Sequence, residues 1–140
     1  TVTNLQALNI LGAGTRGRAV RRFEERRQQG FGAFMDSTTI GSRATLAAVF
    51  AGFAGVTVQA ASANGRRFNI YLPSTGSGPC LAMLQLDGIQ QIDHEILGLM
   101  HPDDIAAVEV YPQCMTIPTE LMRTDARCGL VAVWTKRAFR

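Results

Sequence analysis

Acidic and imidazole side chains gather in one short stretch of the sequence, as a metal site would require. They are Asp93, His94, Glu95, His101, Asp103 and Asp104, all within twelve residues. Imidazole and carboxylate groups are good ligands for zinc or manganese. Their spacing matches no familiar ligand pattern, and Pro102 keeps the two histidines off a common helical face. We therefore predict a polar connection without a metal, in which Pro102, Asp103 and Asp104 begin and cap a short helix.

A glycine-rich stretch near the N-terminus, residues 12–17, fits the pattern G-x-G-x-x-G, and Asp36 follows nineteen residues later. In a strand–turn–helix unit this pattern binds the phosphates of a dinucleotide. The helix expected after it carries arginine on every face, so we do not expect it to pack against a sheet. The chain is also too short and too rich in hairpin signals for a doubly wound sheet. We predict a loop here and no cofactor.

The three cysteines, Cys80, Cys114 and Cys128, have no C-x-x-C spacing, which argues against a zinc ribbon or a thioredoxin-type site. Cys114 with His94 or His101 would be a candidate thiol nucleophile for a hydrolase. Nothing in the sequence orients these partners, and G-x-S-x-G, H-E-x-x-H and P-loop patterns are absent. We predict no catalytic residue and expect that the chain is not an enzyme.

The positive charge is concentrated in one segment. The net charge is +3, and residues 16–27 hold six arginines against two glutamates. Nucleic-acid surfaces interleave basic residues with stacking aromatics, but only Phe23 lies in this segment. We predict a solvated helix, or an arm that contacts an acidic protein or lipid surface, and no nucleic-acid partner. No apolar run approaches the about 20 residues of a membrane-spanning helix.

The length of 140 residues and the hydrophobic fraction of 46% are those of one domain with a core. Because the sequence begins at Thr1, we expect it to be processed or cut from a longer chain. Periodicity predicts helices over 19–29 and 43–53, a hairpin of strands 56–60 and 68–72, and strands 81–86, 108–111 and 130–135. This pattern predicts a small α+β fold, with a small mixed sheet and two or three helices. The predicted core is Leu46, Val49, Phe50, Val56, Leu84, Leu86, Val108, Val110, Val131 and Val133.

Four segments resemble, in the same order, the plug domain of TonB-dependent receptors. They are residues 45–58, 84–89, 102–111 and 128–136. Residues 45–58 are similar to the plug helix that precedes a Pro-Gly-Val strand, and residues 84–89 to the plug strand that ends in Asp-Gly. Residues 102–111 are similar to its helix followed by an Ile-Glu-Val strand, and residues 128–136 to its closing strand, which begins with Gly and continues with hydrophobic residues. Residues 23–27 before Gly30 look like a subgroup in which an arginine-rich helix precedes the plug. The usual Arg-Gly-Pro after the Ile-Glu-Val strand is replaced by residues 112–114.

The resemblance implies a division of the chain and a set of structural residues. Residues 1–29 would be an N-terminal arm with the arginine-rich helix, and residues 30–140 a plug-like α+β domain. Strands 81–86, 108–111 and 130–135 would share one mixed sheet, which would place Cys80 beside Cys128 as a disulfide. The plug-motif residues are Asp87, Gly88, Asp103, Asp104, Glu109 and Gly129.

The function implied by the resemblance is noncatalytic. The domain would gate an outer-membrane barrel and respond to a TonB-type complex, or act alone as a protein-binding module. Either role implies export to the periplasm, outer membrane or cell surface of a Gram-negative bacterium. The alternative is a secreted or surface structural subunit, in which the arm Thr1–Leu11 pairs with the sheet edge of another copy and builds a fibre.

Overall fold

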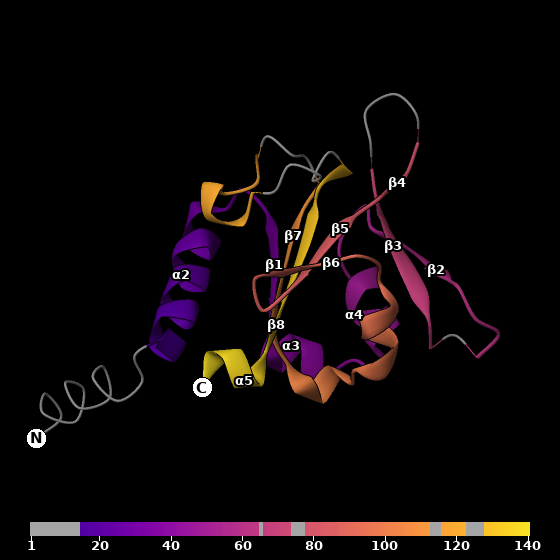
Figure 1. The fold of residues 1–140 in the computed structure, drawn as a ribbon, viewed down its shortest axis with the longest axis horizontal. Coiled ribbons are helices and arrows are strands. Elements are labelled where there is room, and N and C mark those ends of the chain that lie inside the picture. The colour runs from indigo at the N-terminus through magenta and orange to yellow at the C-terminus, as the bar shows by residue number, and fades with distance from the viewer. Residues whose placement is uncertain (1–14, 65, 74–77, 113–115, 123–127) are drawn as a thin grey trace, which may run out of the picture.

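A computed structural model of the chain describes residues 15–64, 66–73, 78–112, 116–122 and 128–140. Within these ranges the chain forms a five-stranded sheet, a three-stranded sheet and short helices (Figure 1). The predicted α+β class is confirmed. None of the helices in the described part of the chain has the length and apolar character needed to span a membrane.

The five-stranded sheet is the centre of the molecule. Its strands are β1 (Ala33–Asp36), β7 (Ile105–Tyr111), β8 (Leu130–Thr135), β5 (Met83–Leu86) and β6 (Ile89–Gln91), in that spatial order. β5 and β8 are parallel and the other neighbours are antiparallel. The expected strands 108–111 and 130–135 therefore share one mixed sheet with residues 83–86 of the expected strand 81–86.

The three-stranded sheet contains β2 (Thr57–Ala60), β3 (Phe68–Leu72) and β4 (Cys80–Leu81). The predicted hairpin is confirmed by the β2–β3 pairing. The strand predicted over 81–86 is split, because its backbone partners change at Ala82. The Ala82 N–H donates to the Ile70 carbonyl, whereas the Met83 N–H donates to the Gly129 carbonyl. The chain thus passes here from one sheet to the other.

The helices are α2 (Thr15–Gln29), α3 (Ser37–Gly41), α4 (Leu46–Ala51) and α5 (Lys136–Phe139), with 3-10 turns η1 (Glu95–Leu99), η2 (Pro102–Asp104) and η4 (Thr119–Leu121). The helix predicted over 43–53 begins later, at Leu46. Its N-cap is Thr45, whose hydroxyl accepts a hydrogen bond from the Ala48 N–H. Ser42, which precedes the predicted helix, is instead the C-cap of α3.

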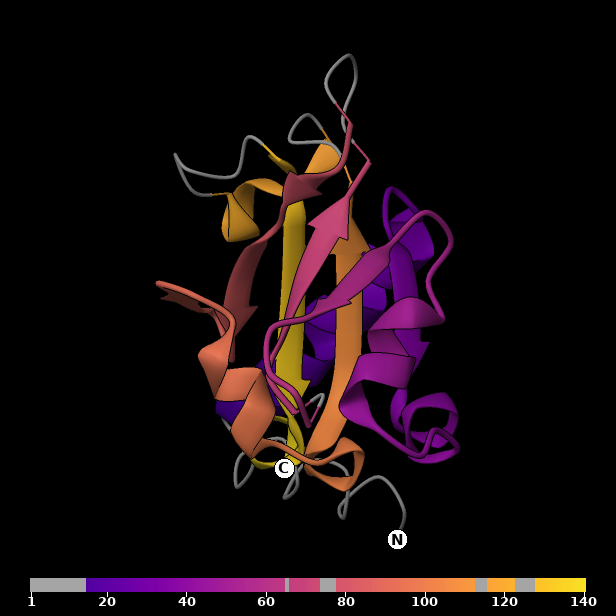
Figure 2. The ribbon, with the colours of Figure 1, turned by 90° about the vertical axis from the view of Figure 1, so that its right-hand side faces the viewer.

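One face of the five-stranded sheet carries the main core. α4 and the three-stranded sheet cover this face (Figures 1 and 2). All ten predicted core residues belong to it: eight are buried, while Val56 and Leu86 are partly buried against the others. The expectation that these residues form one core is confirmed.

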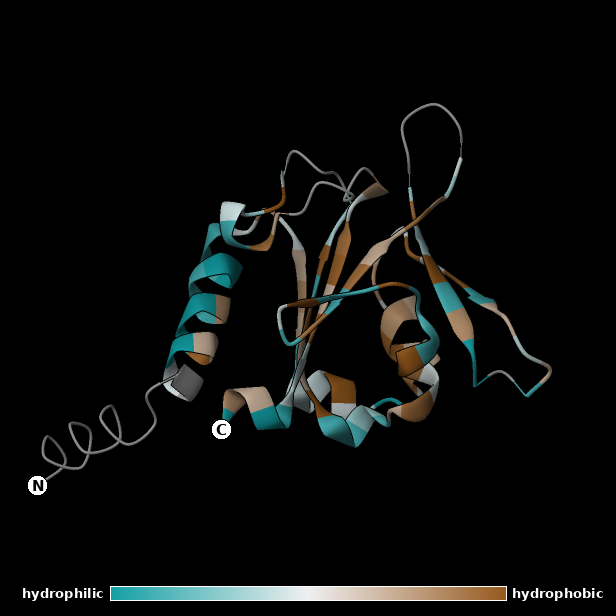
Figure 3. Ribbon diagram, in the orientation of Figure 1, coloured by the Kyte–Doolittle hydropathy of each residue, from teal (hydrophilic) through white to brown (hydrophobic). Residues whose placement is uncertain are grey.

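The opposite face of the sheet is covered by α2, α5 and η4. This finding corrects the expectation that an arginine-rich helix could not pack against a sheet. Phe23 and Arg26 lie one turn apart on α2 and point into the domain, with 2% and 4% of their surfaces exposed. Apart from the half-buried Ala19 and Val20, the rest of α2 is mostly polar (Figure 3). One apolar and one paired polar side chain are thus enough to dock the helix.

Candidate functional site

A buried carboxylate lies at the centre of the sheet face beneath α2. Glu109 is the one charged residue of β7 and is 0% exposed. It shares its face of the strand with Ala107 and Tyr111, because strand side chains alternate. A buried charge is costly unless it is paired and hydrogen-bonded, so the surroundings of Glu109 must supply both.

Four hydrogen bonds satisfy this carboxylate. Arg26 donates twice, from Nε to Oε1 at 2.7 Å and from Nη2 to Oε2 at 2.8 Å. The Tyr111 hydroxyl donates to Oε1 and the Trp134 Nε1 donates to Oε2, each at 2.6 Å. Each oxygen therefore accepts one bond from α2 and one from the sheet. The paired arginine bonds have the bidentate geometry that makes guanidinium–carboxylate pairs strong.

A second carboxylate extends the arrangement to the surface. Glu120 of η4 accepts from Arg26 Nη1 at 2.7 Å and from Arg22 Nη1 at 2.6 Å. The Arg26 guanidinium also lies over the Trp134 ring, 5.6 Å from its centroid. We call Arg26, Glu109, Tyr111, Glu120 and Trp134 the Glu109 cluster.

The surroundings shift the pKa values of three members of the cluster, Arg26, Tyr111 and Glu120. Burial alone would lower the pKa of Arg26, but the hydrogen bonds and charges of Glu109 and Glu120 outweigh it and raise that pKa. Burial, together with the charge of Glu109, raises the pKa of Tyr111, which therefore remains a donor. For Glu120, burial would raise the pKa, but hydrogen bonds from Arg26 and Arg22 lower it below its ordinary value.

Aromatic rings enclose the cluster. Phe23 packs edge-on against Phe34, and Phe34 against Tyr111, with ring centroids 5.9 and 6.0 Å apart. Phe139 of α5 stacks on Trp134 at 6.0 Å and also contacts Phe23. This apolar frame keeps water from the ion pair, which strengthens its attraction.

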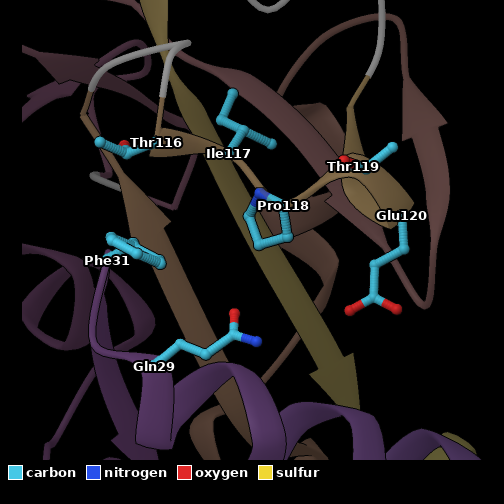
Figure 4. A pocket seen from close by; sticks show the side chains of 7 residues that line it. All are labelled: Gln29, Phe31, Thr116, Ile117, Pro118, Thr119 and Glu120. Atoms are coloured by element: carbon cyan, nitrogen blue, oxygen red, sulfur yellow. The ribbon is translucent and has the colours of Figure 1, made fainter.

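An open groove lies beside the cluster, between the end of α2 and η4. Its volume is about 540 Å³, and Phe31, which is 63% exposed, forms one wall. Glu120 lines both the groove and the cluster. Figure 4 shows its lining residues, Gln29, Phe31, Thr116, Ile117, Pro118, Thr119 and Glu120.

Asp87 and Gly88 form the turn between β5 and β6. Asp87 has a φ of 52°, in the left-handed region that few residues other than glycine adopt. The hydrogen bonds of its carboxylate explain why aspartate and not glycine stands here. Oδ1 accepts from the Thr135 N–H at 2.7 Å, and Oδ2 accepts from the Thr135 hydroxyl at 2.8 Å. The turn is thereby tied to the end of β8.

Gly129 stands where no other residue fits. Its φ is +92°, and a Cβ at this position would lie 2.4 Å from the Tyr111 carbonyl oxygen. This close approach brings the start of β8 beside the end of β7, where Tyr111 pairs with Leu130. Gly129 thus allows the β7–β8 pairing that places Tyr111 and Trp134 beside Glu109.

His101 is the N-cap of η2 and forms a capping box with Asp104, whereas the sequence pattern assigned the capping to Pro102, Asp103 and Asp104. The His101 Nδ1 accepts from the Asp103 N–H at 3.1 Å, and Asp104 Oδ2 accepts from the His101 N–H at 3.0 Å. The two aspartates line a hollow of about 330 Å³ together with Asp87 and with basic residues of the C-terminal segment. The structure therefore gathers Asp87, Asp103 and Asp104, whereas Glu109 belongs to the cluster beneath α2.

His94 is a structural residue in the described fold. Its Nδ1 accepts from the Ile70 N–H at 3.0 Å, and its Nε2 lies 2.9 Å from the Ala82 carbonyl, to which it donates in the neutral form. Burial lowers its pKa. In the described ranges, no three His, Cys, Asp or Glu side chains are placed to hold a metal ion. Cys114 lies outside the described residues.

A disulfide joins Cys80 to Cys128, with their Cα atoms 5.3 Å apart. Cys80 belongs to β4, and Cys128 comes two residues before β8. The bond thus ties the three-stranded sheet to the central strand of the five-stranded one. The parallel pairing of Met83 with Leu130 begins just beyond it, which is the arrangement that the plug resemblance implied.

Arg26, Tyr111 and Trp134 were not predicted as site residues. Two signals in the sequence point to them. Glu109 interrupts an otherwise apolar strand, so it needs a buried partner. Arg26 follows Phe23 by three residues and so shares its helical face. Neither signal identifies the other member of the pair, because 83 residues separate them.

Comparison with solved structures finds similar folds in a peptide importer and in a receptor. The RagAB peptide importer in its open-open state matches 76% of this chain at 19% identity, with a TM-score of 0.57. A mutant ferric enterobactin receptor from Pseudomonas aeruginosa matches 80% at 19% identity, with a TM-score of 0.53. The matches span 12% and 18% of those longer chains. They support the plug-like fold relation that the sequence motifs indicate.

No family model and no curated protein matches the chain.

Proposed function

We propose that this chain is a noncatalytic plug-like domain of an outer-membrane receptor or transporter of a Gram-negative bacterium. The observation that carries the proposal is the fold, which is shared with a peptide importer and a ferric enterobactin receptor. In this role the domain occupies the lumen of a barrel, and its partners are the barrel and a TonB-type complex. The Arg-rich helix and its preceding residues, 1–29, form the segment that leads into the plug-like domain, residues 30–140.

The packing of the domain is consistent with a body that moves as one unit. Within residues 30–140, α4 and the three-stranded sheet cover one face of the central sheet, and α5 and η4 pack on the other. The Cys80–Cys128 disulfide joins the two sheets. Asp87 ties the turn after β5 to the end of β8. A plug that opens by displacement needs such internal ties, because force on one segment must reach the whole body.

The described polar groups favour a noncatalytic role. Both oxygens of Glu109 are bonded to structural donors, and both nitrogens of His94 face backbone groups. A general acid or base needs an atom that can reach a substrate. Neither side chain has one, so we assign both to the fold, and we propose neither a metal nor a cofactor.

The test is the conductance of the complete gene product that contains this sequence, purified from outer membranes and inserted into planar bilayers. We expect it to fractionate with the outer membrane and to conduct poorly. Deleting residues 30–140 should produce a large, persistent conductance, while the matched exposed-face variant Arg21→Ala should conduct like the parent. A gene product that is absent from the outer membrane, or an unchanged conductance after deletion, would show that the domain does not gate a barrel.

The self-assembly alternative depends on the arm Thr1–Leu11, which lies outside the described residues. It stays a prediction from the sequence. Light scattering of the chain with and without residues 1–11 tests it, since a fibre-forming subunit must lose its large species when the arm is removed.

A further inference from the structure

We propose that the β7–β8 face beneath α2 is a binding site for an arginine-bearing helix, and that α2 is its exchangeable occupant. The proposal does not depend on the receptor role. It follows from three features of the Glu109 cluster: the acceptor is built into the sheet, the helix is held by few residues, and the connection between helix and sheet is short and rich in glycine.

The acceptor is organised without α2. Tyr111 and Trp134 are sheet residues, and each holds one oxygen of Glu109 at 2.6 Å. These bonds fix the carboxylate plane and leave one acceptor position on each oxygen facing α2. Two parallel N–H donors of a guanidinium fill these two positions, as Arg26 does. An ammonium group is a point donor that cannot match the fork, so the site favours arginine over lysine.

The same face offers one more acceptor. Gln85 of β5 lies in register with Glu109 across Ala132 and is 1% exposed. Its Nε2 donates to the Leu121 carbonyl at 2.8 Å, but its Oε1 has no hydrogen-bond partner among the described residues. Buried acceptors are usually satisfied, so this oxygen is available to a further donor.

Few side chains of α2 hold it in place. Among those that the structure describes, only Phe23 and Arg26 are buried. Two exposed ion pairs flank them, Arg22 with Glu120 and Arg27 with Asp36. Such surface pairs contribute little to affinity. Recognition therefore rests on one aromatic ring and one guanidinium, spaced three residues apart.

Three of the described arginines of α2, Arg22, Arg26 and Arg27, pair with carboxylates of the domain body. On the outward side, Arg18 and Arg21 are offset by Glu24 and Glu25. The basic segment is thus the ligand of an acidic site within its own chain, so an external acidic partner is not needed to explain it.

The connection from α2 to β1 allows the helix to leave as a unit. Only residues 30–32 separate the two elements. Gly30 has a φ of +75° and open space where a Cβ would be, whereas Gly32 packs closely against Tyr111, so Gly30 is the position in this connection where the backbone can change direction. Departure of α2 would take both guanidinium bonds from Glu109 and uncover this face of the sheet, and a second guanidinium on the same oxygens would restore what is lost. The site therefore exchanges one guanidinium for another and does not stand empty.

The test uses the full chain with Arg26→Gln, which removes the intramolecular guanidinium. The probes are a synthetic peptide of residues 15–29 and the same peptide with Arg26→Lys, which keeps the charge. The readout is the fluorescence of Trp134, the one tryptophan of the chain, whose Nε1 bonds Glu109. We expect a saturable change with the arginine peptide and at least about tenfold weaker binding of the lysine peptide.

Two controls define the site. The double variant Arg26→Gln/Glu109→Gln should not distinguish the two peptides, because the carboxylate is gone. Millimolar guanidinium chloride should shift the Trp134 signal of the single variant more than equal sodium chloride. If the Arg26→Gln chain does not fold by circular dichroism, the Arg26→Lys chain replaces it in the same titration. Equal binding of both peptides, or no response from a folded variant, would overturn the proposal.

Discussion

Replacing Arg26 by methionine should destabilise the protein more than any other single change on α2. Methionine retains much of the side-chain length, but it removes the two bonds to Glu109 and the bond to Glu120. Glu109, at 0% exposure, then keeps only two neutral donors. Removing one partner of a buried ion pair costs about 3–5 kcal/mol, because the other charge stays buried. With a urea slope of about 2 kcal/mol/M, the unfolding midpoint falls by about 2 M.

The assay is urea unfolding followed by circular dichroism, for the single variants Arg26→Met and Glu109→Gln and for the double variant. We expect the double variant to lose at least about 1 kcal/mol less than the sum of the single losses, since the two side chains act on each other. Arg21→Met, on the outward face of the same helix, is the matched control and should change stability by under about 0.5 kcal/mol. Additive losses, or a loss below about 1 kcal/mol for Arg26→Met, would refute the reasoning.

Three further outcomes follow from the same structure. Reducing the Cys80–Cys128 bond, which closes a loop of 48 residues, should lower the unfolding free energy by about 4 kcal/mol, and thiol counting of the oxidised, denatured chain should find one free thiol. Gly129→Ala should lower the melting temperature sharply, because its Cβ would lie 2.4 Å from the Tyr111 carbonyl oxygen; an unchanged melting curve would contradict the β7–β8 junction. Because the pKa of His94 is lowered in the folded chain, its imidazole binds a proton more readily in the unfolded chain. The free energy of unfolding should therefore fall as the pH drops below 6.5. His94→Gln should remove this slope between about pH 6.5 and 5, where carboxylates remain ionised.

The part of the fold that local patterns determine was predictable. Alternating apolar residues indicated the β2–β3 hairpin and the central strands, and all ten predicted core residues lie in or against one cluster. Boundaries were less predictable, because they depend on which backbone partner a residue finds. Ser42 and Thr45 are both good caps by type, and only the structure shows that Thr45 begins α4. The split at Ala82 likewise depends on carbonyls contributed by distant strands.

The docking of α2 was predicted wrongly for a related reason. The composition of the whole helix, with its many arginines and high mean polarity, is typical of a helix that is surrounded by solvent. The position of α2 depends instead on one arginine whose partner lies 83 residues away. Composition is an average over all faces of a helix, whereas a buried ion pair involves a side chain on only one of these faces. A charged residue inside an apolar strand, such as Glu109, is therefore the more informative sign that a polar helix packs nearby.

The buried Arg26–Glu109 pair explains where α2 packs on the sheet better than it explains how firmly α2 is bound there. Desolvating Arg26 and Glu109 offsets most of their attraction, and apolar residues of similar size would hold a helix as firmly. An apolar seam, however, would allow α2 to slide or rotate against the sheet. The bidentate bond, with Tyr111 and Trp134 fixing the carboxylate, is satisfied in only one position and only by a guanidinium. The segment that enters the domain from the N-terminus is thus held at one defined point on the sheet.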